Sequence, residues 1–134
     1  MPYPLRLLLV DDSESFLAAL TVSLADMPQL AIVGTARSAR EAFSQVMRLQ
    51  PHVVVMDIAM PGLNGLEATR YIKAQPQAPS VVILTMYDNA EYRVAAAAAG
   101  ADGFVNKVGC DDTLPALLAE LRLESPGTRS GTNI

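Results

Sequence analysis

The 134-residue chain has one cysteine, one histidine and no long apolar run, and each shortage argues against a class of protein. The lone Cys110 cannot form an internal disulfide, which suits a reducing compartment. Without a cluster of cysteine and histidine, nothing suggests a zinc site. No apolar stretch approaches the roughly 20 residues that cross a bilayer. We therefore expect a soluble, cytoplasmic protein with no secretion signal and no membrane partner.

Clustered positive charge is also missing. The ten lysines and arginines are scattered and the formal net charge is −4, whereas nucleic-acid binding needs basic residues gathered on one surface. We expect this segment to bind no nucleic acid, so any DNA contact would come from another domain. The chain is long enough for one domain with a proper core and too short for a second full one.

Short apolar runs alternate along the chain with longer stretches of helical periodicity. The runs are aliphatic and largely β-branched, as in strands buried on both faces of a sheet. They cover Leu5–Val10, Ala31–Val33, Val53–Met56, Val81–Leu84 and Phe104–Val105. Apolar residues recur at helical spacing between them, and the last two helices are expected at about Ala90–Ala99 and Asp112–Leu123. This order predicts an α/β fold, a doubly wound five-stranded parallel sheet of the (βα)5 type.

Local signals mark several element ends. Ser38 with Glu41, and Asp88 with Glu91, have the spacing of a capping box. Gly100 stands where the helix at 90–99 needs a left-handed terminating residue. From residue 125 the sequence SPGTRSGTNI is small, polar and without periodicity, as in a linker or a flexible tail. We therefore place the domain at residues 1–124 and a tail, or the start of an interdomain linker, at residues 125–134.

Polar residues gather where the strands of the predicted sheet end. Asp11 and Asp12 end the first, Asp57 the third, Thr85 the fourth and Lys107 the fifth. Converging carboxylates are stable as anions only beside a cation, and an all-oxygen donor set favours Mg²⁺. A carboxylate beside such a metal can attack phosphorus, while an ammonium and a hydroxyl neutralise the transferring oxygens. Asp57 is the expected nucleophile, and Lys107 and Thr85 are its helpers.

Four segments, in this order, resemble the receiver domain of two-component response regulators. They are LLLVDD at 7–12, VVVMDIAMPGLNG at 53–65, VVILT at 81–85 and AGADGFVNK at 99–107. The resemblance covers about residues 5–123 and implies the flavodoxin-like receiver fold. It implies that a partner histidine kinase phosphorylates Asp57. It also implies that Asp12, Asp57 and the backbone carbonyl of Ala59 contact Mg²⁺ directly, with Asp11 assisting through water.

The same resemblance implies a conformational switch. Thr85 and Lys107 would contact the phosphoryl group, Thr85 would move inward, and Phe104 behind it would change rotamer. This motion would remodel the face formed by the helix at 90–99, the strand at 104–105 and the helix at 112–123, with homodimer formation on phosphorylation. The run AEYRVAAAAAGADGFVNK resembles receivers that carry a LuxR-type helix-turn-helix output domain. We expect the receiver of a transcription regulator, and the alternative is a stand-alone receiver acting through protein contacts.

The chain departs from the family pattern around the site. Val108 stands where proline is common, and a cis bond before a non-proline costs roughly 2.5 to 4 kcal/mol, so we expect the Lys107–Val108 bond to be trans. Phe104 lacks the hydroxyl that a tyrosine would offer. Ala59 has no polar side chain to guide the water that hydrolyses the phosphoaspartate, and Tyr87 could shade that water. These two residues predict slow self-dephosphorylation.

Several of these residues also have ordinary structural interpretations. Asp11 and Asp12 could simply cap the next helix, and Asn64 is expected to cap the helix that follows the turn at 60–65. Cys110 near a helix start could have a lowered pKa, but an unreactive thiol is the preferred interpretation. His52 precedes the third strand, at the end of the sheet away from the acidic residues, and is interpreted as a surface histidine.

Two other functions fit the sequence less well. A phosphatase with an Asp nucleophile usually needs an acid/base Asp two residues after the nucleophile, where Ala59 stands. A nucleotide-binding module needs a glycine-rich turn after the first strand, where Asp11 and Asp12 would instead repel a pyrophosphate. We therefore expect a protein that catalyses only its own phosphorylation and dephosphorylation, with no turnover of an outside substrate.

Overall fold

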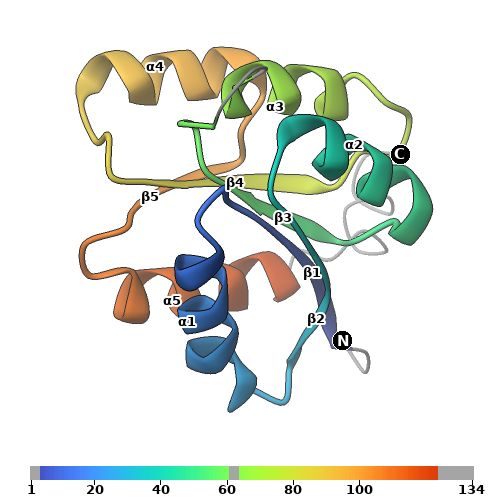
Figure 1. The fold of residues 1–134 in the computed structure, drawn as a ribbon, viewed down its shortest axis with the longest axis vertical. Helices are drawn as coiled ribbons and strands as arrows, with labels where there is room; N and C mark the ends of the chain where they lie inside the picture. Colours follow the sequence, from blue (N-terminus) through green and yellow to red (C-terminus); the bar gives the residue numbers. More distant parts are fainter. Residues whose placement is uncertain (1–3, 61–63, 124–134) are drawn as a thin grey trace.

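The computed structural model describes residues 4–60 and 64–123, which form a parallel sheet with helices on both faces (Figure 1). The five strands follow the order β2-β1-β3-β4-β5. They are β1 (Leu5–Val10), β2 (Leu30–Ala36), β3 (Val53–Met56), β4 (Ser80–Thr85) and β5 (Gly103–Asn106). The helices are α1 (Glu14–Ala25), α2 (Ala39–Leu49), α3 (Gly65–Lys73), α4 (Ala90–Ala99) and α5 (Cys110–Leu123). The predicted (βα)5 fold is confirmed.

The sheet separates two hydrophobic cores. Helices α1 and α5 cover one face, and α2, α3 and α4 cover the other (Figure 1). Successive side chains of a strand point to opposite faces, so Leu7 and Leu9 of β1 pack with Leu17 of α1 and Leu114 of α5, while Leu8 belongs to the opposite core. This two-sided burial explains why the strands are continuous apolar runs in the sequence. Among the described helices, none is long and apolar enough to span a membrane.

The parallel register aligns the carboxyl ends of the central strands. Val10 of β1 lies opposite Met56 of β3, and Met56 lies opposite Ile83 of β4. Asp11 directly follows β1 and Asp57 directly follows β3. The N–H of Asp57 donates to the carbonyl of Val10 at 3.0 Å. The chain order reverses between β1 and β3, which is where doubly wound sheets bind ligands. Strand pairing thus fixes where the two carboxylates emerge.

Several elements are longer than predicted, among them the fourth and fifth strands by one residue at each end. The second strand runs from Leu30 to Ala36 rather than over 31–33, because its glycine- and threonine-containing end still pairs with β1. The last helix begins at Cys110, two residues earlier than expected. The carbonyl of Gly109 accepts the N–H groups of Asp112 and Thr113 and so closes the first turn. Residues 61–63 and 124–134 lie outside the described residues, so the predicted domain boundary near 124 stays a prediction.

Two helix starts behave as their sequences predict. The N–H of Glu41 donates to Oγ of Ser38 at 3.1 Å, and the Glu41 carboxylate in turn accepts the N–H of Arg37 at 2.6 Å. The Glu41 carboxylate of this capping box therefore accepts the N–H of the residue before the cap, rather than the N–H of the cap itself. At α3, the N–H of Glu67 donates to Oδ1 of Asn64 at 2.9 Å. Both side chains satisfy amides that a helix start would otherwise leave without a partner.

The capping box predicted at Asp88 and Glu91 is wrong. Asn89 caps α4 instead, and its Oδ1 accepts the N–H of Tyr92 at 2.8 Å. Asp88 is drawn away by an ion pair with the guanidinium of the arginine five residues later. The other end of α4 is as expected, since Gly100 adopts a φ of 100° and terminates the helix.

His52 and Cys110 both have structural roles. Nδ1 of His52 accepts the N–H of Arg6 at 3.0 Å, which ties the start of β3 to β1. His52 is half-buried rather than a surface residue, and burial together with the charge of Arg6 lowers its pKa. Cys110 is buried, and burial, aided by the charge of Asp111, raises the pKa of its thiol. Both features support the interpretation of Cys110 as an unreactive thiol, which stays a prediction.

Gly65 opens α3 directly against the backbone of Asp57. Its N–H donates to the carbonyl of Ile58 at 3.0 Å, and a Cβ on Gly65 would lie 2.0 Å from the carbonyl oxygen of Asp57. Backbone atoms cannot rotate out of the way as a side-chain tip can. Gly65→Ala should therefore displace the Asp57 loop and lower the free energy of unfolding by about 1–3 kcal/mol, as overpacking does. Urea unfolding measures this change.

Gly34→Ala is the matched control for Gly65→Ala. A Cβ on Gly34 would meet Cδ1 of Leu49 at 2.8 Å, and that methyl group is the end of a flexible side chain. We expect Gly34→Ala to cost clearly less than Gly65→Ala. Equal losses in the two variants would show that the close approach to the backbone of Asp57 is not the cause.

Candidate functional site

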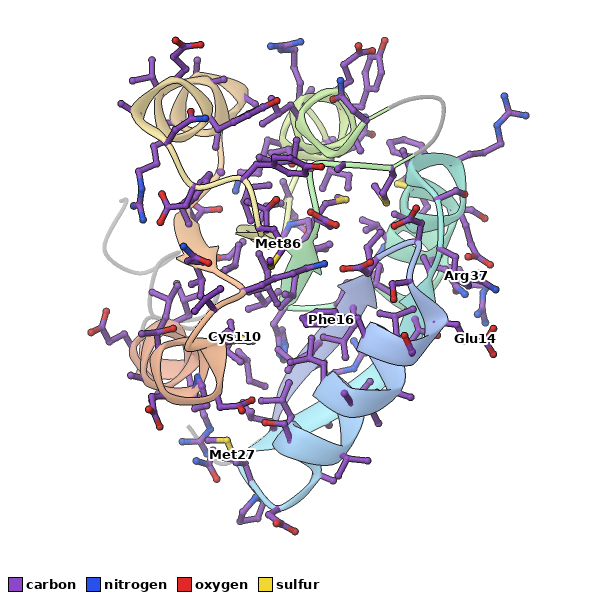
Figure 2. All side chains as sticks on the ribbon, turned by 60° about the vertical axis from the view of Figure 1, so that its left-hand side comes forward. Glu14, Phe16, Met27, Arg37, Met86 and Cys110 are labelled. Carbon is purple, nitrogen blue, oxygen red and sulfur yellow. The ribbon has the colours of Figure 1, made fainter. Side chains whose placement is uncertain are left out.

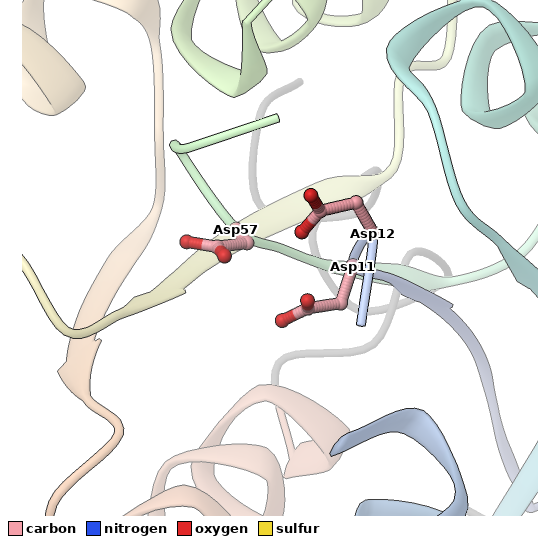
Figure 3. Close-up of side chains that lie close together, drawn as sticks. All are labelled: Asp11, Asp12 and Asp57. Atoms are coloured by element: carbon pink, nitrogen blue, oxygen red, sulfur yellow. The ribbon is translucent and has the colours of Figure 1, made fainter. Parts of the chain in front are cut away.

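Three carboxylates converge at the carboxyl ends of β1 and β3 (Figure 3). Asp11 and Asp12 follow β1, Asp57 follows β3, and one oxygen of each lies within 4.8 Å of the others. Asp11 and Asp57 are buried, whereas Asp12 is exposed. The cluster predicted from the sequence is thus assembled, and it is open to solvent on the side of Asp12.

Lys107 reaches this cluster from the end of β5. Its Nζ lies 2.6 Å from Oδ2 of Asp11 and 3.2 Å from Oδ2 of Asp57, and its side chain is only 11% exposed. Burial by itself would lower the pKa of Lys107, but the hydrogen bonds and charges of the two aspartates outweigh burial and raise it. The ammonium therefore stays charged at neutral pH. It offsets one of the three negative charges.

Asp11 has a second role in the turn before α1. While Oδ2 pairs with Lys107, Oδ1 accepts the N–H of Ser13 at 2.9 Å. Ser13 is the N-cap, and its Oγ accepts the N–H of Phe16 at 3.2 Å. The N-cap is therefore Ser13 and neither aspartate, so the interpretation of Asp11 and Asp12 as caps is wrong; Asp11 instead supports the turn before the cap and pairs with Lys107.

Thr85 is fully buried at the end of β4, next to Lys107, which directly follows the neighbouring strand β5. The N–H of Lys107 donates to the carbonyl of Thr85 at 2.9 Å. Oγ1 of Thr85 accepts the N–H of Tyr87 at 3.2 Å. Because the hydroxyl accepts this bond, its own proton remains available for donation. Thr85 is thus placed at the same sheet edge as Asp57.

The second oxygen of Asp57 faces the following turn. Oδ1 accepts the N–H of Ala59 at 3.4 Å, a long hydrogen bond, while Oδ2 pairs with Lys107. The bond between Lys107 and Val108 is trans, as predicted, since the described residues contain no cis peptide. Oδ1 of Asn106 accepts the N–H of Val108 at 2.8 Å. A proline at 108 could not make this bond, so valine gives the loop an anchor of its own.

Two groups of contacts at this edge were not found by sequence reasoning. Nζ of Lys107 lies 4.1 Å from the ring centroid of Phe16. Arg93 pairs with Asp88 through bonds of 2.6 and 3.0 Å, and its guanidinium lies 4.6 Å above the ring of Phe104. The bond from Arg93 lowers the pKa of Asp88. Helical spacing marks Phe16 only as a core residue, so its contact with Lys107 has no signal in the sequence.

The donor set of the cluster fits a hard divalent cation. Three carboxylates and one ammonium leave two negative charges unmatched. All candidate ligand atoms are oxygens, one carboxylate is exposed, and hard cations such as Mg²⁺ accept one or two carboxylates together with water. The described residues therefore supply both the charge and the chemistry that such an ion requires.

Comparison with known families decides the class of the protein. The family model of the response regulator receiver domain matches residues 7–119, which is most of the chain. The chain belongs to this family. It is therefore a signalling switch of a two-component system, and the resemblance seen in the sequence is confirmed.

The curated proteins similar to this chain include both a response regulator and an enzyme. The receiver is 37% identical over 103 residues to the response regulator GacA of Pseudomonas protegens, which covers 77% of this chain and 48% of GacA. It is 40% identical over 105 residues to a protein-glutamate methylesterase/protein-glutamine glutaminase of Symbiobacterium thermophilum, covering 78% of this chain and 29% of that enzyme. The chain thus spans about half, or less, of the curated relatives it matches.

A solved structure extends the likeness to three dimensions. The two-component response regulator of the LuxR family from Aurantimonas sp. SI85-9A1 has a TM-score of 0.85 and 30% sequence identity. The match covers 95% of this receiver and 94% of that chain. The order of strands and helices in this receiver is thus shared with a LuxR-family regulator over nearly its whole length.

Asp12 is the carboxylate whose removal best tests the charge argument. Asp12→Asn should leave the metal-free receiver at least as stable as the parent, because it relieves repulsion among the carboxylates. Mg²⁺ at ten times its Kd should stabilise the parent by about 1.4 kcal/mol and the variant far less. Thermal unfolding in Mg²⁺ and in EDTA measures both effects.

Asp26→Asn serves as the matched control for Asp12→Asn. Asp26 is an exposed aspartate at the C-cap of α1, outside the acidic cluster, so its removal changes net charge by the same amount. The control should keep the full response to Mg²⁺. An undiminished response in Asp12→Asn would exclude Asp12 from the metal site.

Proposed function

We propose that Asp57 accepts a phosphoryl group from the phosphohistidine of a partner kinase. The observation that carries this proposal is the setting of its carboxylate. It is buried at the end of a central strand, pairs with Lys107 through Oδ2, and lies within 4.8 Å of Asp11 and Asp12 oxygens. A nucleophile so placed is prepared for in-line attack on phosphorus, which depends on positioning and charge neutralisation.

The acidic cluster would hold Mg²⁺. In this proposal Asp12, Asp57 and the backbone carbonyl of Ala59 are direct ligands, and Asp11 acts through water. When bound, the ion neutralises negative charge on the phosphoryl oxygens. Support comes from the all-oxygen donor set and from the two negative charges that Lys107 leaves unmatched.

The remaining steps belong to the side chains themselves. A carboxylate oxygen of Asp57 bonds to phosphorus as the bond between phosphorus and the kinase's histidine nitrogen breaks. Lys107 then stabilises a phosphoryl oxygen in place of one carboxylate contact. The hydroxyl of Thr85 would donate a hydrogen bond to another oxygen of the phosphoryl group. That bond would draw Thr85 inward.

The response would pass from Thr85 to the face of α4, β5 and α5. Phe104 of β5 is half-buried beneath the guanidinium of Arg93, which also pairs with Asp88, so a change of its rotamer would remove one of the two contacts of that guanidinium. This coupling supports Phe104 as a switch residue. We propose that the remodelled face governs homodimer formation.

The output would be transcriptional control in the cytoplasm, through a LuxR-type DNA-binding domain beyond this chain. The likeness to a LuxR-family regulator at 30% identity supports this choice. The methylesterase relatives make another output the alternative, and the chain covers only 29% of the first of them. A stand-alone receiver is the third case. In each case the receiver itself turns over no outside substrate.

Loss of the phosphoryl group should be slow. Tyr87 is 52% exposed on the loop after β4, its N–H donates to Oγ1 of Thr85, and the centroid of its ring lies 5.9 Å from that of Tyr92. Ala59 offers no polar side chain to the attacking water. Tyr87→Ala should therefore shorten the lifetime of the phosphoaspartate in Mg²⁺ buffer. A parent lifetime no longer than that of the variant would contradict this role.

Asp57→Asn tests the proposed function. Acetyl phosphate with Mg²⁺ should add one phosphoryl group to the parent and none to Asp57→Asn, because the amide is not a nucleophile of comparable strength. Intact-protein mass spectrometry reads the result. Asp112→Asn, at an exposed carboxylate of α5, is the control and should be modified like the parent. Release of phosphate from an added ester at enzyme-like rates would instead favour a phosphatase.

A further inference from the structure

Phe16 lies against the ammonium of Lys107. The 4.1 Å between Nζ and the ring centroid is well inside the roughly 6 Å over which an aromatic face attracts a cation. Figure 2 shows Phe16 on the first turn of α1. Because the side chain of Lys107 is only 11% exposed, water competes weakly for the ammonium. The contact therefore belongs to the stronger, desolvated kind.

The ring is positioned by the same residue that pairs with Lys107. Oδ1 of Asp11 accepts the N–H of Ser13, and Oγ of Ser13 accepts the N–H of Phe16. Oδ2 of Asp11 pairs with Lys107, whose ammonium meets the Phe16 ring. The contacts thus form a closed circuit from the carboxylate through the helix start to the ring. The backbone of Phe16 and the ammonium of Lys107 are thus both anchored to the carboxylate of Asp11.

The ring differs from the other two partners of Lys107 in one respect. Asp11 and Asp57 both belong to the cluster that can hold a metal ion, and Asp57 is the proposed phosphoacceptor. A cation or a phosphoryl group would therefore compete with Lys107 for their oxygens. The ring of Phe16 binds neither. It is the contact that can hold the ammonium unchanged before and after phosphorylation.

We propose that Phe16 is a positioning residue, whose aromatic face keeps the ammonium of Lys107 at the site while the carboxylates are engaged elsewhere. The proposal rests on phosphorylation of Asp57. Phe16 also packs, partly buried, against the core beside α1. A test must therefore separate the effect of the aromatic face from ordinary loss of packing.

Three variants make that separation. Phe16→Leu keeps an apolar side chain and removes the aromatic face, whereas Phe16→Tyr keeps the face. Phe43→Leu makes the same chemical change at a partly buried phenylalanine in the opposite core, on α2. If Phe16→Leu fails to fold, Phe16→Met takes its place, since methionine is unbranched and adapts to its surroundings.

The position of Lys107 can be read without metal or phosphoryl donor. In NMR spectra, protons that lie over an aromatic face resonate at lower frequency than other protons. The chemical shifts of the εCH₂ protons of Lys107, measured in isotopically labelled protein, therefore show whether the ring lies against this side chain. We expect this displacement in the parent, in Phe16→Tyr and in Phe43→Leu, and its loss in Phe16→Leu. An unchanged signal in Phe16→Leu would overturn the proposal.

The rate of phosphorylation supplies the functional readout. With acetyl phosphate and Mg²⁺, the initial rate should fall between about threefold and thirtyfold in Phe16→Leu, the range of a cation–π contact, and should be retained in Phe16→Tyr and Phe43→Leu. Equal losses in Phe16→Leu and Phe43→Leu would reduce Phe16 to a packing residue. A parent that gains no phosphoryl group would overturn the proposed function, and the NMR signal would then decide alone whether the ring holds Lys107.

Discussion

The site depends on the two ion pairs that the ammonium of Lys107 forms with Asp11 and Asp57. The ammonium joins the ends of β1, β3 and β5 and offsets part of the repulsion among three carboxylates. Removing it would leave two buried carboxylates without a cationic partner, which costs several kcal/mol in typical proteins. The two hydrophobic cores hold the sheet together against the repulsion that remains. The fold thus keeps three carboxylates close together, and a bound cation would offset the negative charge that Lys107 leaves unmatched.

The sheet could be predicted because parallel strands buried on both faces leave unbroken aliphatic runs. The third strand, Val53–Met56, has the same bounds in the sequence interpretation and in the structure. The second and fifth strands were predicted too short, since glycine, threonine and asparagine at their ends give no apolar signal. Those residues are strands only because a neighbouring strand pairs with them, as Thr35 does with Leu9. Such pairing is a tertiary property that local pattern does not contain.

The acidic cluster could be predicted for a geometric reason, because the carboxyl ends of parallel strands meet at one edge. The hydrogen-bond and ion-pair partners of each carboxylate oxygen could not be predicted. Asp88 and Asn89 are both good caps by type, and the choice between them was made by Arg93, which draws Asp88 into an ion pair beside Phe104. The contact of Phe16 with Lys107 spans most of the chain and has no periodic signature. Sequence reasoning therefore found the charged groups and missed the side chains that hold them in place.

Phosphorylation of Asp57, in a site whose charge is balanced by Lys107 and a divalent cation, is the event that we propose this receiver to undergo. Peptide mapping by mass spectrometry, after treatment with acetyl phosphate in Mg²⁺ or in excess EDTA, tests it most directly. We expect a phosphoryl group on Asp57 alone, and only in Mg²⁺. A phosphoryl group on another side chain, or equal incorporation in EDTA, would contradict it.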